Sequence, residues 1–354
     1  MAKDLLLVGS IPCNTVEEVF RTWGKTFAPH LKYLPDGEVG DRLHWIDGQA
    51  YRTFNGHPQI ETVKRPEPDD GVERWKPRNL EDQWQFRVKP GVKRVGFADR
   101  GWRLGYARDA INSYFVFKTL KKEGVLPSDL RFMVALPTPE SATALYFREP
   151  GQWDAIKPAY EDAMLAEIAT MVEHIPPGDL AIQWDAACES VDIEFGLPWL
   201  GPITEERFTR YVDQFGRLSA PIPKEVQLGY HACYGTLGGW PTVQATTLAN
   251  EVRFLNEAVA RSKRHVDFVH LPTMNRTDDE YSSMLRDLKV GETEIYLGLI
   301  HNMESFKPRL AAARKYLKSF KIAAPCGFGR ITPAQAQQVL KDHQQALAIF
   351  EQPG

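Results

Sequence analysis

The sequence predicts an α/β fold in which eight parallel strands alternate with helices and close into a TIM (β/α)8 barrel. Three observations favour it: short apolar runs typical of buried strands recur eight times, helical patterns separate them, and no strand leads into the GxGxxG fingerprint of a dinucleotide-binding sheet. A doubly wound open sheet is the alternative. Because such a barrel often occupies several hundred residues, we expect residues 1–354 to form a single domain.

The predicted strands are runs rich in Val, Ile, Leu and aromatic residues, as expected for strands buried on both faces. They cover residues 5–12, 32–38, 131–139, 180–185, 225–233, 266–272, 294–302 and 320–329. The predicted helices cover residues 15–27, 113–124, 159–175, 204–219, 247–262, 305–319 and 332–350. The first helix carries a start signal, since Asn14 or Thr15 is a suitable N-cap and Glu17 and Glu18 follow in the first turn.

One interval, residues 40–109, is too long to be a single connection between a strand and a helix. It is rich in charged residues, proline and tryptophan. We interpret it as an inserted loop, or lid, over the mouth of the barrel; a passive surface excursion is the alternative. Trp45 and Trp102 in this segment are candidates for stacking over an apolar or aromatic substrate.

The composition excludes several classes of partner. The net charge of −3 provides no basic field for a nucleic acid, and no run approaches the roughly 18 apolar residues of a membrane span. The N-terminus has no signal-peptide pattern, and four widely spaced cysteines do not form a disulfide framework. We therefore expect a cytoplasmic protein that acts on small molecules, and the sequence leaves its oligomeric state open.

Chemically useful residues gather at the predicted strand ends, where the active sites of such barrels lie. The fifth strand ends in His231 and Cys233, which are two residues apart and so point to the same side. The eighth strand ends near Cys326, so a second thiol can meet them at the barrel mouth. Two thiolates and one imidazole suit Zn2+, and three protein ligands leave one position open, as a catalytic zinc requires.

These strand ends resemble those of the catalytic barrel of cobalamin-independent methionine synthase. The superfamily of that barrel also contains uroporphyrinogen decarboxylase and the zinc methyltransferases acting on coenzyme M. The resemblance covers nearly the whole chain and rests most on HACYG at 231–235 and CGFGR at 326–330. Weaker matches are VGSIP at 8–12, DGEVGDR at 36–42, LPT at 136–138 and the strand that carries Asp185.

The resemblance implies a role for each matching residue. The zinc ligands would be His231, Cys233 and Cys326, and an amino-acid thiol would contact Gly9, Ser10, Glu38 and Asp185. The chain departs from the family at the fourth zinc ligand, because Pro272 stands where the family has a glutamate. His270, a water molecule or the substrate would then take the fourth position.

The implied reaction transfers an alkyl group, most simply a methyl group, from an alkyl donor to a zinc-activated small-molecule thiol. The leaving group needs a proton, and His301 and His270 are candidates to supply it because imidazole titrates near neutrality. Asp185 is a further catalytic candidate, and with Glu38 it is also a candidate to hold a cationic part of the substrate.

Arg42 and Arg330 are candidates to bind a substrate carboxylate or sulfonate. Three other functions remain open. One is a metal-independent lyase of the decarboxylase branch, in which Asp36, Arg42 and Arg330 handle an acidic substrate. Another is zinc-dependent addition of a thiol to an epoxide-type electrophile, and the last is a structural zinc that only clamps the fifth strand to the eighth.

Overall fold

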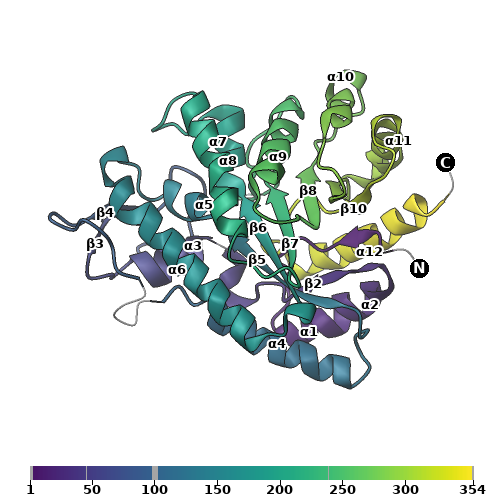
Figure 1. Cartoon of the computed structure of the whole chain (residues 1–354), viewed down its shortest axis with the longest axis horizontal. Helices are drawn as coiled ribbons and strands as arrows, with labels where there is room; N and C mark the ends of the chain where they lie inside the picture. The colour runs from purple at the N-terminus through teal and green to yellow at the C-terminus, as the bar shows by residue number, and fades with distance from the viewer. Residues whose placement is uncertain (1–2, 45, 98–102, 238, 353–354) are drawn as a thin grey trace.

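The barrel predicted from the sequence is present in the computed structural model, which describes residues 3–44, 46–97, 103–237 and 239–352 (Figure 1). Its parallel strands run in the order β1-β10-β9-β8-β7-β6-β5-β2, and a bridge from Leu5 to Leu31, just before β2, nearly closes the circle. The fold prediction is confirmed, and the open sheet is wrong. The strands are β1 (Leu5–Leu6), β2 (Tyr33–Pro35), β5 (Arg131–Pro137), β6 (Leu180–Ala186), β7 (Gln227–Ala232), β8 (Phe268–Pro272), β9 (Glu294–Gly298) and β10 (Lys321–Ala323).

Helices surround the strands, and every segment predicted to be helical contains helix. The first is α1 (Val16–Val19) and α2 (Lys25–Phe27) joined by a π-helical turn, and the others are α4 (Tyr106–Lys122), α6 (Trp153–His174), α8 (Glu205–Ser219), α9 (Ala249–Arg261), α11 (Phe306–Tyr316) and α12 (Pro333–Phe350). The sequence did not predict the short helices α5 (Pro139–Ala144), α7 (Ala187–Phe195) and α10 (Asp279–Ser282). Among the described residues, no helix is both long and apolar enough to cross a membrane.

The interior of the barrel is packed with side chains from seven of its eight strands. This inner cluster contains Leu6, Val8, Tyr33, Met133, Ala181, Phe268, Tyr296 and Ala323. Tyr33 stacks on Phe268 with 4.7 Å between the ring centroids. The Phe268 ring lies directly over Gly229, where an added Cβ would come within 2.0 Å of the ring. Because the strand middles are filled in this way, open space for a ligand lies at the strand ends.

The inserted segment after β2 has structure of its own. It contains a 3-10 turn (Gly40–His44), α3 (Ile46–Gln49), a π-helical turn (Ala50–Phe54) and an antiparallel pair, β3 (Ile60–Lys64) and β4 (Gln85–Val88). In Figure 1 this pair stands at one side of the barrel, beyond α6. The predicted boundary at residue 109 is too late, because α4 already begins at Tyr106. Trp45 and Trp102 lie outside the described residues.

Candidate metal centre and substrate pocket

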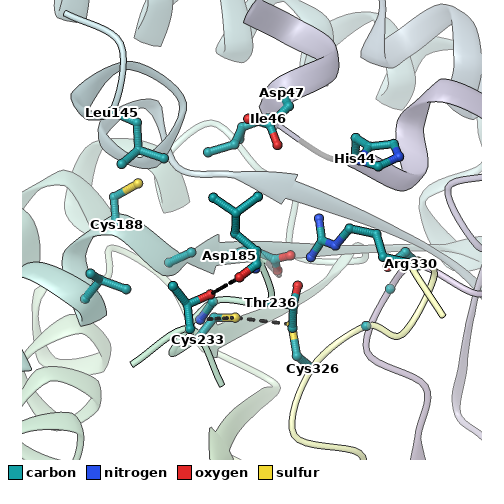
Figure 2. A pocket seen from close by; sticks show the side chains of 18 of the residues that line it. His44, Ile46, Asp47, Leu145, Asp185, Cys188, Cys233, Thr236, Cys326 and Arg330 are labelled. Carbon is teal, nitrogen blue, oxygen red and sulfur yellow. Dashed lines mark hydrogen bonds between the residues drawn. The ribbon is translucent and has the colours of Figure 1, made fainter. Parts of the chain in front are cut away.

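A pocket of about 840 Å³, its open mouth included, lies at the carboxyl ends of the strands (Figure 2). This is the end of the barrel at which active sites form, and the volume suits a small organic molecule. The pocket has walls of two kinds. The residues from the strand ends are mostly polar, and include Ser10, Glu38, Asp185, His231, Cys233, Cys326 and Arg330. The inserted segment and the helices α5 and α7 add a mostly apolar wall.

His231, Cys233 and Cys326 meet at the floor of this pocket. One ligand atom from each residue lies within 4.8 Å of the others, although Cys326 follows Cys233 by 93 residues. The two Sγ atoms are 3.2 Å apart. His231 is on β7, Cys233 is the first residue after that strand, and Cys326 is in the loop after β10. The barrel therefore places together the three residues that the sequence predicted as zinc ligands.

The two cysteines are coupled because they are buried side by side. The neighbouring Cys233 thiol, followed by the nearby His231, holds the pKa of Cys326 well below its usual range. The same contact, followed by burial, raises the pKa of Cys233 well above its usual range. The contact therefore favours the thiolate on Cys326 and the protonated thiol on Cys233. A thiolate is the form in which cysteine binds a metal.

A chain of hydrogen bonds fixes the tautomer of His231. The Nδ1 atoms of His231 and His270 are 2.6 Å apart, and Nε2 of His270 lies 3.0 Å from the carbonyl oxygen of Ala324. Because a carbonyl only accepts, Nε2 of His270 carries a proton, and its Nδ1 must accept one from Nδ1 of His231. This leaves Nε2 of His231 with a free lone pair, and that buried atom has no partner among the described residues.

The geometry therefore fits a metal ion. The orphaned imidazole nitrogen and the two sulfur atoms form a set of donors that suits Zn2+, and the imidazole is oriented by a further hydrogen bond, as is usual for metal-binding histidines. Within the described part of the chain, no fourth His, Cys, Asp or Glu joins the group. His270 is not the fourth ligand, because both of its ring nitrogens are already engaged.

Two carboxyl groups predicted to bind substrate, Glu38 and Asp185, do line the pocket. Burial, followed by the charge of Asp36, raises the pKa of Glu38 to about 8. Burial, followed by the charge of Glu38, raises the pKa of Asp185 well above its usual range. Oδ1 of Asp185 accepts a hydrogen bond of 2.8 Å from Gln183. Burial therefore favours the protonated form of both carboxyls in the ligand-free chain.

Gly9 and Ser10 line the pocket too, and Ser10 also anchors the loop that carries Cys326. Its hydroxyl accepts a hydrogen bond of 3.2 Å from the amide of Gly329, and its carbonyl accepts one of 2.9 Å from the amide of Phe328. A Cβ added at Gly327 would come within 2.6 Å of the Ser10 hydroxyl. The CGFGR segment is glycine-rich because it runs in contact with the end of the first strand.

The two predicted substrate arginines have different environments. Arg330 lines the pocket, and Figure 2 shows its side chain pointing into it. Arg42 does not line the pocket. It makes a salt bridge of 2.8 Å with Asp36 and borders a separate cavity behind Glu38. The prediction that Arg42 binds substrate is therefore not supported, because a carboxylate of the chain already occupies its guanidinium.

The structure also separates the two predicted proton donors from the pocket. His270 is fully buried beside His231, and burial followed by the charge of His231 lowers its pKa well below the usual range. His301 does not line the pocket, and its Nε2 lies 2.8 Å from the carbonyl oxygen of Thr273. Burial, followed by the charge of Arg309, lowers the pKa of His301 to about 3. Neither His270 nor His301 is therefore placed to protonate a leaving group in the pocket, contrary to the expectation from the sequence.

Sequence reasoning missed the residues of the opposite wall. His44, Ile46 and Asp47 from the insert, Leu145 after α5 and Cys188 on α7 all line the pocket, and in Figure 2 they lie across it from Cys233 and Cys326. Asp47 accepts a hydrogen bond of 2.8 Å from Tyr146, and burial raises its pKa to about 6. Cys188 was visible as one of four cysteines, but nothing in its local sequence distinguishes it from a buried structural thiol.

Comparison with known proteins does not place the chain in a family. No protein-family model matches it, and a search of curated proteins finds no match. The resemblance to methionine synthase barrels therefore stays a prediction. What the structure adds is that the two segments on which it most depends, 231–235 and 326–330, line one pocket.

Proposed function

We propose that this protein is a zinc-dependent enzyme that transfers an alkyl group, most simply a methyl group, to the sulfur of a small-molecule thiol. One observation carries the proposal: the ligand atoms of His231, Cys233 and Cys326 lie within 4.8 Å of one another on the floor of a pocket. Three donors facing an open pocket are typical of a catalytic rather than a structural zinc.

Each group of the chain has a defined role in this proposal. His231, Cys233 and Cys326 would hold the metal, which when bound lowers the pKa of a thiol so that a thiolate exists at neutral pH. In the overall reaction a sulfur–carbon bond forms, the bond from that carbon to the leaving group breaks, and the thiol proton is given up. Asp185, whose protonated form is favoured by burial, would give its proton to the leaving group, and the thiol proton would then restore it.

The arrangement supports the metal-independent lyase less well. That function would use Asp36, Arg42 and Arg330 together on one acidic substrate. Asp36 and Arg42 are instead bound to each other beside a separate cavity, and only Arg330 enters the pocket. Addition of a thiol to an epoxide uses the same metal centre, and it differs only in the electrophile.

The first test is metal content together with spectroscopy. We expect about one zinc per chain, and loss of that zinc in Cys233→Ser and Cys326→Ser. Cys13→Ser is the matched control, because Cys13 is partly buried but lies outside the pocket. In the cobalt-substituted protein, the thiolate-to-metal absorption band should grow when a substrate thiol such as homocysteine or 2-mercaptoethanesulfonate is added.

The second test is turnover with these thiols and three donor types: a methylated amine, a methyl ether and an epoxide. Thioether products are measured by mass spectrometry. Thioether formation that persists after zinc has been removed would refute the proposed role of the metal. Formation of a hydroxyalkyl thioether from the epoxide alone would identify the addition reaction.

A further inference from the structure

Arg330 differs from the other buried arginines because it makes no direct hydrogen bond or salt bridge within the described residues. Its charge acts only through space: it opposes the burial that raises the pKa of Glu38 and Asp47, and it adds to the effect of the Cys233 thiol, which lowers the pKa of Cys326. Arg42 pairs with Asp36 at 2.8 Å, and Arg207 pairs with Asp192 at 2.6 Å. Arg330 is partly buried, yet it makes no hydrogen bond and no salt bridge with any described residue. An unpaired, partly desolvated guanidinium is costly, so it marks a position where a ligand supplies the missing anion.

The backbone around Arg330 holds it in place. The preceding glycines run against Ser10: an added Cβ at Gly329 would come within 2.7 Å of the Ser10 Cβ and 2.4 Å of a Leu43 methyl group. The ring of Phe328 packs on Trp23 with 4.9 Å between centroids. The loop therefore cannot move easily away from the pocket, and Arg330 is preorganised to bind.

The wall across the pocket from Cys233 and Cys326 is mostly apolar, and its polar members are His44, Asp47 and Gln83. It contains Ile46 and Leu80 from the insert, Leu145 after α5 and Val191 on α7, and all four line the same pocket as Arg330. Asp47 is the acidic residue on this side, and its carboxylate already accepts a hydrogen bond from Tyr146. A ligand in this part of the pocket meets hydrocarbon on one side and a guanidinium on the other.

We propose that the substrate bound beside the metal centre is an amphiphilic organic acid, with its carboxylate or sulfonate on Arg330 and its apolar body against Ile46, Leu80, Leu145 and Val191. Guanidinium binds such anions through two parallel N–H···O bonds. The inference deepens the proposed function, since this acid would be the second substrate of the same site. Its anion subsite is made by the chain alone and does not require the metal.

The test is isothermal titration calorimetry with matched probes: hexanoate, hexane-1-sulfonate, hexanamide and acetate. Hexanoate should bind about 10-fold or more tightly than hexanamide, as expected for hydrogen bonds to a charged group. It should also bind about 10-fold or more tightly than acetate, because its additional methylene groups are buried. In Arg330→Gln the preference for hexanoate over hexanamide should disappear, while Arg330→Lys should retain part of it.

Arg52→Gln is the control, because Arg52 is a partly buried arginine of the insert that is paired with Asp41 at 3.1 Å and lies outside the pocket. It should leave the preference unchanged. Equal binding of hexanoate and hexanamide by the unmodified protein, or a preference that survives in Arg330→Gln, would overturn the inference. Equal binding of acetate and hexanoate would overturn its apolar part.

The same titrations on the zinc-depleted protein separate this inference from the proposed function. An anion preference in a protein that binds no zinc supports the acid subsite and refutes only the zinc enzyme. A protein that binds zinc and alkylates thiols but shows no anion preference refutes only the acid subsite.

Discussion

The imidazole rings of His231 and His270 face each other across neighbouring strands, with 2.6 Å between their Nδ1 atoms. His270 in turn donates to the Ala324 carbonyl, two residues before Cys326. Together, these two hydrogen bonds connect β7 to β8 and β8 to the loop after β10. The first of them also aims the free lone pair of His231 at the position where a metal would bind.

The first prediction concerns this orienting contact. His270→Leu removes the acceptor for the His231 proton, so zinc affinity should fall about 10- to 100-fold, as for other residues that orient metal ligands. His270→Gln keeps an oxygen that accepts and an amide that donates, so it should recover part of the affinity. Competition with a chromophoric chelator measures both values, and circular dichroism checks the fold. Equal affinities in the folded Leu and Gln variants would contradict the orienting role.

The second prediction concerns the two thiols. With Sγ atoms 3.2 Å apart, Cys233 and Cys326 need little movement to reach the bond length of about 2.05 Å of a disulfide. Diamide should therefore oxidise this pair in the zinc-depleted protein, taking up the two thiol hydrogens itself. The zinc-loaded protein should resist this oxidation, because thiolates bound to the metal are less able to react with diamide. Peptide mapping by mass spectrometry identifies the bond.

Cys13 and Cys188 are internal controls for this oxidation. Burial raises the pKa of each thiol, followed in each case by a nearby glutamate, so neither is a good nucleophile. Crosslinks that involve either residue, or equally fast oxidation with and without zinc, would be inconsistent with the arrangement described here.

The third prediction concerns the packed barrel interior. Gly229→Ala places a methyl group within 2.0 Å of the Phe268 ring, so the ring or the strand must shift. Overpacking of a filled core costs about 1–3 kcal/mol, and we expect at least that loss in the free energy of unfolding in urea. Gly178→Ala is the matched control, because no atom lies within 4 Å of its added Cβ. Equal stabilities of the two variants would contradict the packing.

The fourth prediction is a pH dependence from His343. This histidine is fully buried on α12 between Trp23 and Phe328, and burial lowers its pKa from 6.5 to about 4. Below pH 6.5 the unfolded chain binds a proton that the folded chain does not, so stability falls as the pH drops from about 6.5 to about 4. The loss from this residue is about 3 kcal/mol at most.

His343→Phe keeps an aromatic ring at this position but cannot titrate. Urea unfolding of the zinc-depleted proteins at pH 7 and pH 4.5 should show a loss of stability about 2–3 kcal/mol smaller in the variant than in the parent. Parallel pH profiles for the two proteins would show that His343 does not contribute.

The barrel could be predicted because its strands are buried on both faces and so appear as continuous apolar runs. The helices α5 and α7 could not, because each begins within two residues of the end of a strand and their apolar patterns merge. The inserted segment has no dominant period, since short turns and one β pair alternate in it. The sequence therefore does not predict its β pair or the residue at which it ends and α4 begins.

For the candidate site, too, some features could be predicted from the sequence and others could not. His231 and Cys233 are placed by the strand period, and Cys326 by the equivalence of strand ends in a barrel. Arg42 and Arg330 have the same chemistry in the sequence, and only the fold shows that Asp36 neutralises one of them. The roles of His270 and His301 depend on the neighbours of their ring nitrogens, which no spacing rule gives.

Ser10 holds the segment that carries Cys326 and Arg330, and 319 residues separate it from Gly329. The first and last strands of the barrel are neighbours, so the segment after β1 lies beside the segment that carries Cys326. During synthesis, Cys233 leaves the ribosome 93 residues before Cys326. A nascent chain therefore carries only part of the ligand set. A metal ion bound by all three residues would indicate that the barrel has closed.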